Sequence, residues 1–376
     1  MTKAAELAKM GEVLTNSQIG GRRNILINGG LQISQRGTDL NDVSHGDYCA
    51  DRFQITKANT DQLVINYDQS TDTPDGFSNS FKLSVGTVES AIDTNEYLMI
   101  NQKIEAQNLQ HLKYGTSSAE TLTLSFHVKS SVTGTYAISV FQQDASKYYS
   151  TTYTVNSANT WEYKTVKING NTSDIINNDN GSGLRLSWTL SSGSNFTSGS
   201  NDAWGASSNW AVGHNASWIT TSSATFFLTG VQLEVGSQAT PFEHRSFGEE
   251  LALCQRYCVQ IVNTENGSAH IILAGMSRGS TNKNFTLPLP VTMRNTTPSV
   301  TLTGDVRLLN PEAHDYVNAT DTLTCGGVTP TLVYMGNMLG LLYTGSVTGV
   351  TDTGNADYNF QIVSASDHLF IIDAEL

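Results

Sequence analysis

Three tryptophans, Trp204, Trp210 and Trp218, recur in a stretch made mostly of Gly, Ser and Asn between residues 191 and 218. This composition cannot form a core of its own, and an exposed indole is costly unless it makes a contact. The flat apolar face of an indole suits the C–H face of a sugar ring. We therefore predict that Trp204 or Trp210 contacts a sugar, whereas the residues around Trp218 favour the start of a strand.

Polar side chains that could hydrogen-bond sugar hydroxyls accompany these rings. They are Asn201, Asp202, Asn209, His214 and Asn215. An alternative stays open for the tryptophans of this stretch, which could instead fold back over the end of a β-sandwich or lie in a subunit interface. The other two tryptophans, Trp161 and Trp188, lie in alternating strand patterns, so we expect both in the core.

A second polar stretch, residues 177–183, contains Asp179 and is preceded by Asp174. Carboxylate and carbonyl oxygens could ligate a structural Ca²⁺ here, but the regular acidic spacing and distal Glu of a helix–loop–helix calcium site are missing. A plain turn is the favoured interpretation, so we expect no cofactor apart from that Ca²⁺ alternative. Cys254 and Cys258 lie one helical turn apart without a completing ligand set, and buried free thiols are predicted.

Catalytic signatures are weak along the chain. Its 34 acidic residues guarantee chance carboxylate pairs, but no stretch concentrates Asp, Glu and aromatic residues as the cleft of a glycoside hydrolase would. The sequence has neither a His-Glu-x-x-His pair nor a phosphate-binding loop. We predict that the protein is not an enzyme.

The formal net charge is −13, and no run of Lys and Arg is longer than Arg22-Arg23. Phosphate backbones and anionic lipid surfaces attract clustered positive charge, so we expect no binding to nucleic acid. No stretch approaches 18 consecutive apolar residues, and the first residues lack the apolar centre of a signal peptide. We expect a soluble protein, made in the cytoplasm and not inserted into a membrane.

Strands must position these residues. Charged side chains make up only 15% of the chain, against roughly 25% in an average soluble protein. Ten short segments alternate apolar and polar residues between turn clusters, without helices between them, which predicts an antiparallel jelly-roll β-sandwich. The predicted strands are 51–58, 61–68, 79–86, 96–105, 120–130, 135–143, 150–156, 161–170, 184–190 and 224–236.

The hydrophobic period changes within residues 226–258. It runs first at every second residue, with Phe227, Thr229, Val231, Leu233 and Val235 on one side, and then at every third or fourth residue. A strand that hands over to a helix is typical of a domain boundary, which we place near residue 247. The chain is thus predicted to be all-β, with these parts: an N-terminal segment with a short helix and connector (1–44), the sandwich (45–247), a connector helix (248–258) and a second, smaller β domain (259–376).

The N-terminal helix carries Leu7, Met10 and Leu14 at spacings of three and four. This seam is only one heptad long, so the helix would be marginal alone in water. We expect these three residues to pack on a partner chain or on another part of a larger particle; a frayed terminus is the alternative.

Five blocks of the sequence together resemble the recurring blocks of bacteriophage tail-fibre proteins that carry a jelly roll like that of carbohydrate-binding modules. The blocks are NILINGGLQISQRGT (24–38), ADRFQI (50–55), TGVQLEVGSQATPFEHRSFGEELALCQRYC (229–258), LPLPVTMRNTTPSVTLTG (287–304) and FIIDAEL (370–376). They occur in the order seen in that family and span nearly the whole chain from residue 24. One departure is Cys258, where the family often has a second Tyr.

The resemblance implies a tail-fibre protein of the virion that binds a glycan on the host surface and mediates adsorption. It also implies a homotrimer, and we expect the N-terminal segment to dock on other tail or baseplate proteins. The family offers no uniform catalytic motif, and its sugar contacts vary. Two alternatives remain: a structural fibre, capsid-decorating or tail-connecting protein that binds no sugar, and a glycan depolymerase.

Overall fold

The computed structural model describes residues 23–205, 208–263, 271–278, 282–295, 298–303, 306–309, 331–335, 338–344, 357–362 and 368–376. The predicted N-terminal helix, with Leu7, Met10 and Leu14, lies outside these residues. The chain divides into two compact units, residues 1–250 with Leu376 and residues 251–375. No helix of the described ranges is both long and apolar enough to cross a membrane.

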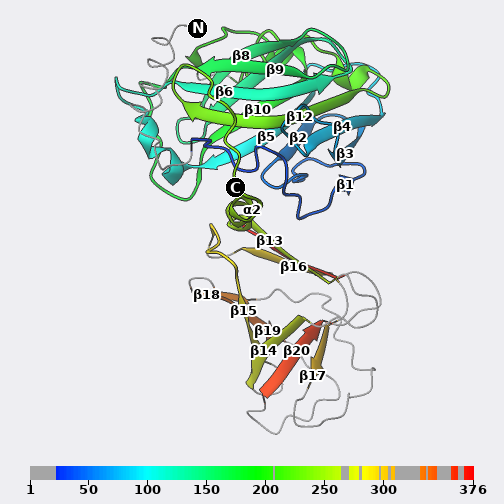
Figure 1. Ribbon diagram of the computed structural model, residues 1–376, viewed down its shortest axis with the longest axis vertical. Coiled ribbons are helices and arrows are strands. Elements are labelled where there is room, and N and C mark those ends of the chain that lie inside the picture. Colours follow the sequence, from blue (N-terminus) through cyan, green and yellow to red (C-terminus); the bar gives the residue numbers. More distant parts are fainter. Residues whose placement is uncertain are drawn as a thin grey trace. The chain divides into compact units, whose positions relative to one another are not determined.

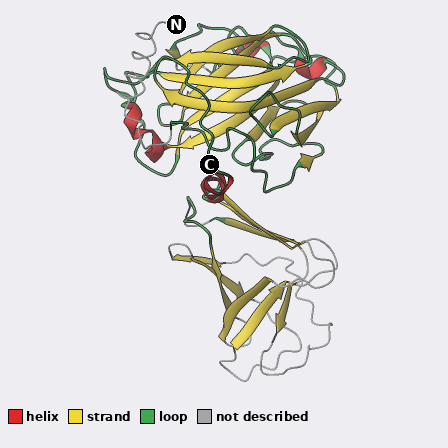
Figure 2. Cartoon of the chain, in the orientation of Figure 1, coloured by secondary structure: helices red, strands yellow, loops and turns green. Residues whose placement is uncertain are grey.

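Unit 1 is a sandwich of two six-stranded antiparallel sheets (Figures 1 and 2). Sheet A has the order β1 (Asp39–Leu40), β3 (Val64–Ser70), β4 (Ser80–Thr87), β12 (Thr225–Val235), β6 (Leu122–Ser130), β9 (Glu162–Ile168). Sheet B has the order β11 (Trp204–Gly205), β8 (Lys147–Val155), β7 (Gly134–Gln142), β10 (Ser182–Ser192), β5 (Tyr97–Glu105), β2 (Gln54–Ala58). The chain crosses repeatedly between the two sheets, as in a jelly roll. The ten predicted strands are all present.

Side chains along the strands alternate between the core and the outer face of each sheet, but β12 departs from this alternation. Phe226 and Leu228 are fully buried between the sheets, and the pairing with β6 then shifts between Thr229 and Gln232. Gly230 takes a positive φ of 61° at this bulge, a conformation that costs glycine little. The extra residue lets Val231 reach the core as well. The predicted face was therefore wrong: Phe227 and Thr229 point away from the core, because the bulge reverses the alternation.

The aromatic centre of the sandwich is Trp188, which is fully buried. Its ring contacts Phe53 and Phe126, with centroids 6.3 and 5.9 Å apart. The prediction that Trp188 lies in the core is confirmed, but Trp161 is half-buried outside sheet A, where its ring lies under the ammonium of Lys129. That expectation was wrong because Trp161 precedes β9 (Glu162–Ile168) and its ring packs against Phe227 and Lys129, away from the core.

Helical segments are few. They are the 3₁₀ turns η1 (Ala106–Leu112), η2 (Ser194–Phe196) and η3 (Trp218–Thr220), and the helix α2 (Phe247–Gln255). Trp218 is fully buried in η3 and does not start a strand. The connector helix ends three residues earlier than predicted, since Cys258 is already the first residue of β13. Cys49, Cys254 and Cys258 are buried free thiols, as predicted.

Unit 2 is also antiparallel β-structure. One sheet has the order β13 (Cys258–Asn263), β21 (His368–Asp373), β16 (Ser299–Thr303). The other has the order β17 (Val306–Leu309), β20 (Asp357–Ile362), β14 (Ile271–Arg278), β15 (Asn282–Pro288), β19 (Met338–Thr344), β18 (Thr331–Met335). The prediction of a second, smaller β region is thus confirmed.

Candidate functional site

The tryptophan-bearing loop between β10 and β12 lies against the outer face of sheet B. Backbone atoms of Trp210 and Val212 hydrogen-bond the hydroxyl of Ser150 in β8, both at 3.2 Å. The Trp210 ring stacks on Phe196 at 4.5 Å and meets Tyr97 edge-on at 5.1 Å. Only 5% of Trp210 is exposed, so it presents no free face to a sugar. Of the two interpretations left open by the sequence, folding back over the sandwich describes Trp210.

Trp204 is half-buried and packs against the core at the end of sheet B. Its Nε1 donates to the carbonyl of Asn169 at 2.7 Å, and its ring meets Tyr114 edge-on at 5.9 Å. Because both its N–H and its ring make contacts within the sandwich, Trp204 serves to pack the protein. Trp204 and Trp210 therefore do not form a shared platform.

The predicted polar companions do not converge on one point either. His214 is buried: its Nδ1 accepts the backbone N–H of Ala137 at 3.3 Å, and its Nε2 donates to the carbonyl of Ala216 at 3.0 Å. Burial lowers the pKa of His214 to about 4. Asn209 donates to Ser198, while Asn201 and Asp202 are exposed. These residues anchor and border the loop.

The outer face of sheet B offers a different set of residues, placed by strand register. Arg185 of β10 is paired with Phe141 of β7, and Phe141 with Tyr148 of β8. One step along the strands, Ser187 is paired with Ser139 in the same way. The row of large side chains thus runs beside a row of small hydroxyls, and the loop with Trp210 borders the hydroxyl row on its other side.

Tyr97 of β5 closes this arrangement near the loop. Burial raises the pKa of Tyr97, and the charge of Arg185 acts in the opposite direction, so the phenol lies within electrostatic reach of Arg185. Tyr97 and Tyr148 both pack against the small cluster formed by Trp210, Met99 and Ala137. We call the following residues the sheet B site: Tyr97, Ser139, Phe141, Tyr148, Arg185, Ser187 and Trp210.

Several polar groups of the sheet B site lack a hydrogen-bond partner within the described part of the chain. Among the described residues, no hydrogen bond is made by the hydroxyl of Ser139 or Ser187. Arg185 Nη2 donates to the Tyr148 hydroxyl at 3.3 Å, but Arg185 Nε is buried without a partner. Rings that border free hydroxyls can stack on a sugar and bond its hydroxyl groups. The sequence shows this alternation in each strand but not which strands are neighbours, so the site was missed.

The proposed calcium ligands have internal partners. Asp179 accepts the backbone N–H of Gly181 at 2.8 Å, which closes a tight turn. Asp174 accepts from the side chain of Asn171 at 3.1 Å. Within the described ranges, no three His, Cys, Asp or Glu side chains come together as a metal site would require.

One match to a catalytic spacing occurs in unit 2. Residues 275–279 read Gly-Met-Ser-Arg-Gly, the spacing of a nucleophile elbow. The elbow needs a sharp turn from a strand into a helix. Ser277 instead lies inside β14, paired with Lys283 of the antiparallel strand β15. The spacing therefore carries no catalytic argument here.

A latch joins the first and third blocks of the sequence that resemble the fibre family. Asn24 donates to the carbonyl of Val231 at 2.9 Å and accepts from the backbone of Leu233 at 3.0 Å. Arg245 donates to the carbonyls of Asn24 and Leu26 and forms ion pairs with Glu243 and Glu250 at 3.1 and 3.2 Å. These contacts fasten the start of the sandwich to its last strand.

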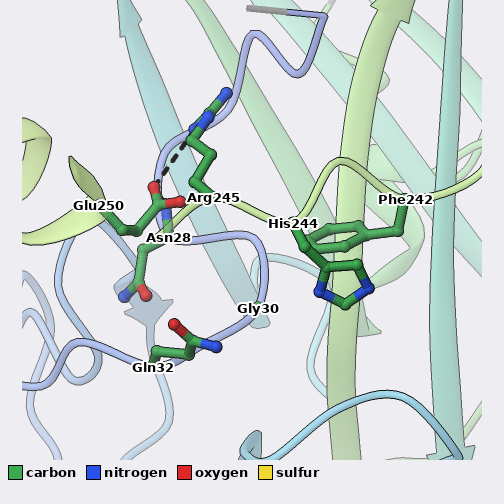
Figure 3. A pocket seen from close by; sticks show the side chains of 7 residues that line it. All are labelled: Asn28, Gly30, Gln32, Phe242, His244, Arg245 and Glu250. Atoms are coloured by element: carbon green, nitrogen blue, oxygen red, sulfur yellow. Dashed lines mark hydrogen bonds and ion pairs between the residues drawn. The ribbon is translucent and has the colours of Figure 1, made fainter. Parts of the chain in front are cut away.

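A small cavity lies beside the latch, with Arg245 and Glu250 on one side and Phe242 and His244 on the other (Figure 3). It holds about 10 Å³, the room of a single water. Glu250 also accepts the backbone N–H of Asn28. The cavity is therefore part of the latch, too small for a sugar.

Comparisons with known proteins add the following. No family model matches the chain, and no curated protein is similar to it. A putative sugar-binding protein from Bacteroides thetaiotaomicron is 11% identical over 57% of this chain and all of its own, with a TM-score of 0.32. A structure titled as CBM4 is 14% identical over 56% of this chain and 98% of its own, with a TM-score of 0.31.

The enzymatically active domain of tailspike protein 4 from bacteriophage CBA120 is 13% identical. The match covers 52% of this chain and 21% of the tailspike chain, with a TM-score of 0.27. Because all three TM-scores lie below 0.5, the fold described above rests on strand order and register alone.

Proposed function

We propose that this chain is a bacteriophage fibre protein that binds a glycan of the host surface through the sheet B site and so mediates adsorption. The observation that carries the proposal is the half-buried aromatic surface of Phe141 and Tyr148 beside Arg185, a cation that has no carboxylate partner among the described residues. The sequence blocks that resemble tail fibres support the setting in a virion. The latch gives two of those blocks a shared structural role.

A sugar ring would bind through two kinds of contact. Tyr148 and Phe141, whose ring centroids are 4.3 Å apart, offer a half-exposed aromatic surface for the C–H face. Arg185 and the Tyr148 hydroxyl offer hydrogen-bonding groups beside that surface, and the nearly buried hydroxyls of Ser187 and Ser139 follow one step along the strands. Trp210 acts through Tyr97, which it holds edge-on, and serves as a positioning residue.

Assembly completes the proposal. The residues that precede Asn24 attach the chain to other tail or baseplate proteins, and three copies associate as a homotrimer in the virion. Three linked sites raise the affinity for a cell surface well above that of one site, because later contacts become intramolecular. The proposal assigns no reaction to the protein.

Binding of the intact chain to a panel of immobilised bacterial surface polysaccharides tests the proposal. We expect at least one polysaccharide to be bound, and Tyr148→Ala to weaken that binding about tenfold, as removal of an aromatic contact often does. Tyr163→Ala is the matched control, because Tyr163 is 51% exposed on the other sheet. A chain that binds no polysaccharide, or a Tyr148→Ala variant that binds like the unaltered chain, would contradict the proposal. New reducing ends in the same incubation would instead support a depolymerase.

A further inference from the structure

Arg185 is the cation of the sheet B site. It lies on β10, a central strand of sheet B, and is half-buried. Arg245 has two carboxylate partners, but within the described part of the chain no carboxylate pairs with Arg185. The same holds for Arg23, Lys57, Lys147 and Lys167, none of which lies in the sheet B site. The protein has 34 acidic against 21 basic residues, so the missing partner does not reflect a shortage of acids.

The register places a second cation directly beside Arg185. Lys103 of β5 is its paired residue. Like charges directly opposite each other destabilise a sheet. Lys103 Nζ donates to an oxygen of Leu376, so Lys103 has an acceptor of its own, whereas Arg185 has no carboxylate partner among the described residues.

Two contacts hold the Arg185 guanidinium in place but leave one of its nitrogens without a hydrogen-bond partner among the described residues. Its Cζ lies 5.0 Å from the centre of the Phe141 ring, and one nitrogen donates to the Tyr148 hydroxyl. Both contacts orient the planar group, while Nε remains buried and without a partner. An oriented guanidinium can donate two parallel hydrogen bonds to a carboxylate or phosphate. An arginine buried this far normally has its donors satisfied.

We propose that Arg185 makes the sheet B site selective for an anionic sugar, one whose ring carries a carboxylate or a phosphate. The inference rests on the proposed function, because it names the ligand class of the same site. The anionic group accepts hydrogen bonds from Arg185 on the side of Phe141 and Tyr148. The ring hydroxyls then lie over Ser187 and Ser139, one step along the strands.

The test measures binding of the intact chain to polygalacturonate, to the same polymer after reduction of its carboxyl groups, and to a phosphomannan. We expect an anionic polymer to bind at least tenfold more tightly than the reduced one. Comparison of the two anionic polymers shows whether the site binds the carboxylate or the phosphate group. Arg185→Gln should weaken binding of the anionic polymers at least tenfold and so remove the preference for them over the reduced polymer. Arg185→Lys keeps the charge but loses the two-point geometry, so its preference should fall between the two.

Tryptophan fluorescence on heating shows whether each variant is folded, and Arg185→Lys serves if Arg185→Gln is not. Equal binding of reduced and unreduced polymers by the unaltered chain would overturn the inference while leaving glycan binding intact. So would an Arg185→Gln variant that keeps the preference. Absence of binding to all three polymers and to every polysaccharide of the wider panel would overturn the proposed function as well.

Discussion

The outer faces of the two sheets both carry aromatic side chains, but they use them differently. On sheet A, rings touch one another in succession: Tyr163 lies 4.9 Å from His127, His127 lies 5.3 Å from Phe77, and Phe77 lies 5.0 Å from Phe242. On sheet B, the rings border hydroxyls and a guanidinium nitrogen that have no partner. An unpartnered polar atom alone does not distinguish the two faces, because His127 Nδ1 on sheet A is also buried without a partner in the described part of the chain. The binding role that we propose for sheet B depends on the combination of half-buried rings with Arg185.

The rings of sheet A have an internal purpose. Phe77 lies over the bulge at Gly230, where an added Cβ would come 2.6 Å from the ring. Phe242 and His244 belong to the segment that carries the latch arginine. The rings thus fasten this segment and the loop before β4 onto the sheet. Beside them, hydrogen bonds from Lys129 and Trp161 hold the pKa of Asp72 below its usual range.

The largest effect is expected at the latch. Arg245→Met leaves the carboxylates of Glu243 and Glu250 without their cation, and breaking a buried ion pair from one side costs about 3–5 kcal/mol. All five tryptophans lie between residues 161 and 218, so fluorescence of the intact chain reports the unfolding of unit 1 alone. Arg23→Met is the control, because among the described residues that side chain donates to the neutral acceptors of Thr240 and Pro241 and to no carboxylate. Equal losses in both variants would contradict the role of the ion pairs.

Acid should act selectively on sheet B through His214. Its pKa is about 4 in the folded protein against about 6.5 in the unfolded chain, because burial disfavours the charged ring. The unfolded state binds the proton more tightly, so the stabilisation is complete above pH 6.5 and is lost as the pH falls from 6.5 to 4. The full loss is roughly 3 kcal/mol for this shift. Protonation of Nδ1 also removes the acceptor for Ala137 N–H.

Thermal unfolding between pH 7.5 and 4.5 measures this dependence. His214→Gln retains one acceptor and one donor but does not titrate, so its unfolding temperature should vary less with pH. An unchanged pH dependence in this variant would assign the acid sensitivity to other groups. The glycan affinity of the folded, unaltered chain should change little over this range and fall only as the pH approaches 4, because His214 then becomes protonated in the folded protein.

A smaller loss is expected from the ring cluster on sheet A. Phe77→Ala removes a half-buried ring that contacts three others, and we expect a loss of about 1–3 kcal/mol, less than for a fully buried Phe. Glycan binding should stay unchanged. A Phe77→Ala variant with full stability but impaired binding would reverse the roles assigned to the two faces.

Sequence patterns predicted the strands well because alternation is a local property, and Trp188 shows that it also identifies core residues. Two features depended on distant parts of the chain. The bulge at Gly230 reverses the faces of β12, and only the pairing with β6 reveals it. The sheet B site arises because β7, β8 and β10 become neighbours, although β9 separates β8 from β10 in the sequence. Trp210 misled the sequence argument because its loop has a core to fold onto.

The smallest effect on affinity is expected from removal of a single hydroxyl, and it compares the outer faces of sheets A and B directly. Ser187 is only 1% exposed, so Ser187→Ala removes at most one neutral hydrogen bond to the ligand, which contributes about 0.5–1.5 kcal/mol, and affinity should fall by no more than about tenfold. Stability should not change, because that hydroxyl has no partner among the described residues. Ser84→Ala makes the same change on the outer face of sheet A, where Ser84 is paired with Thr225. Calorimetric titration of both variants with the same polysaccharide compares them, and equal affinities would remove Ser187 from the sheet B site.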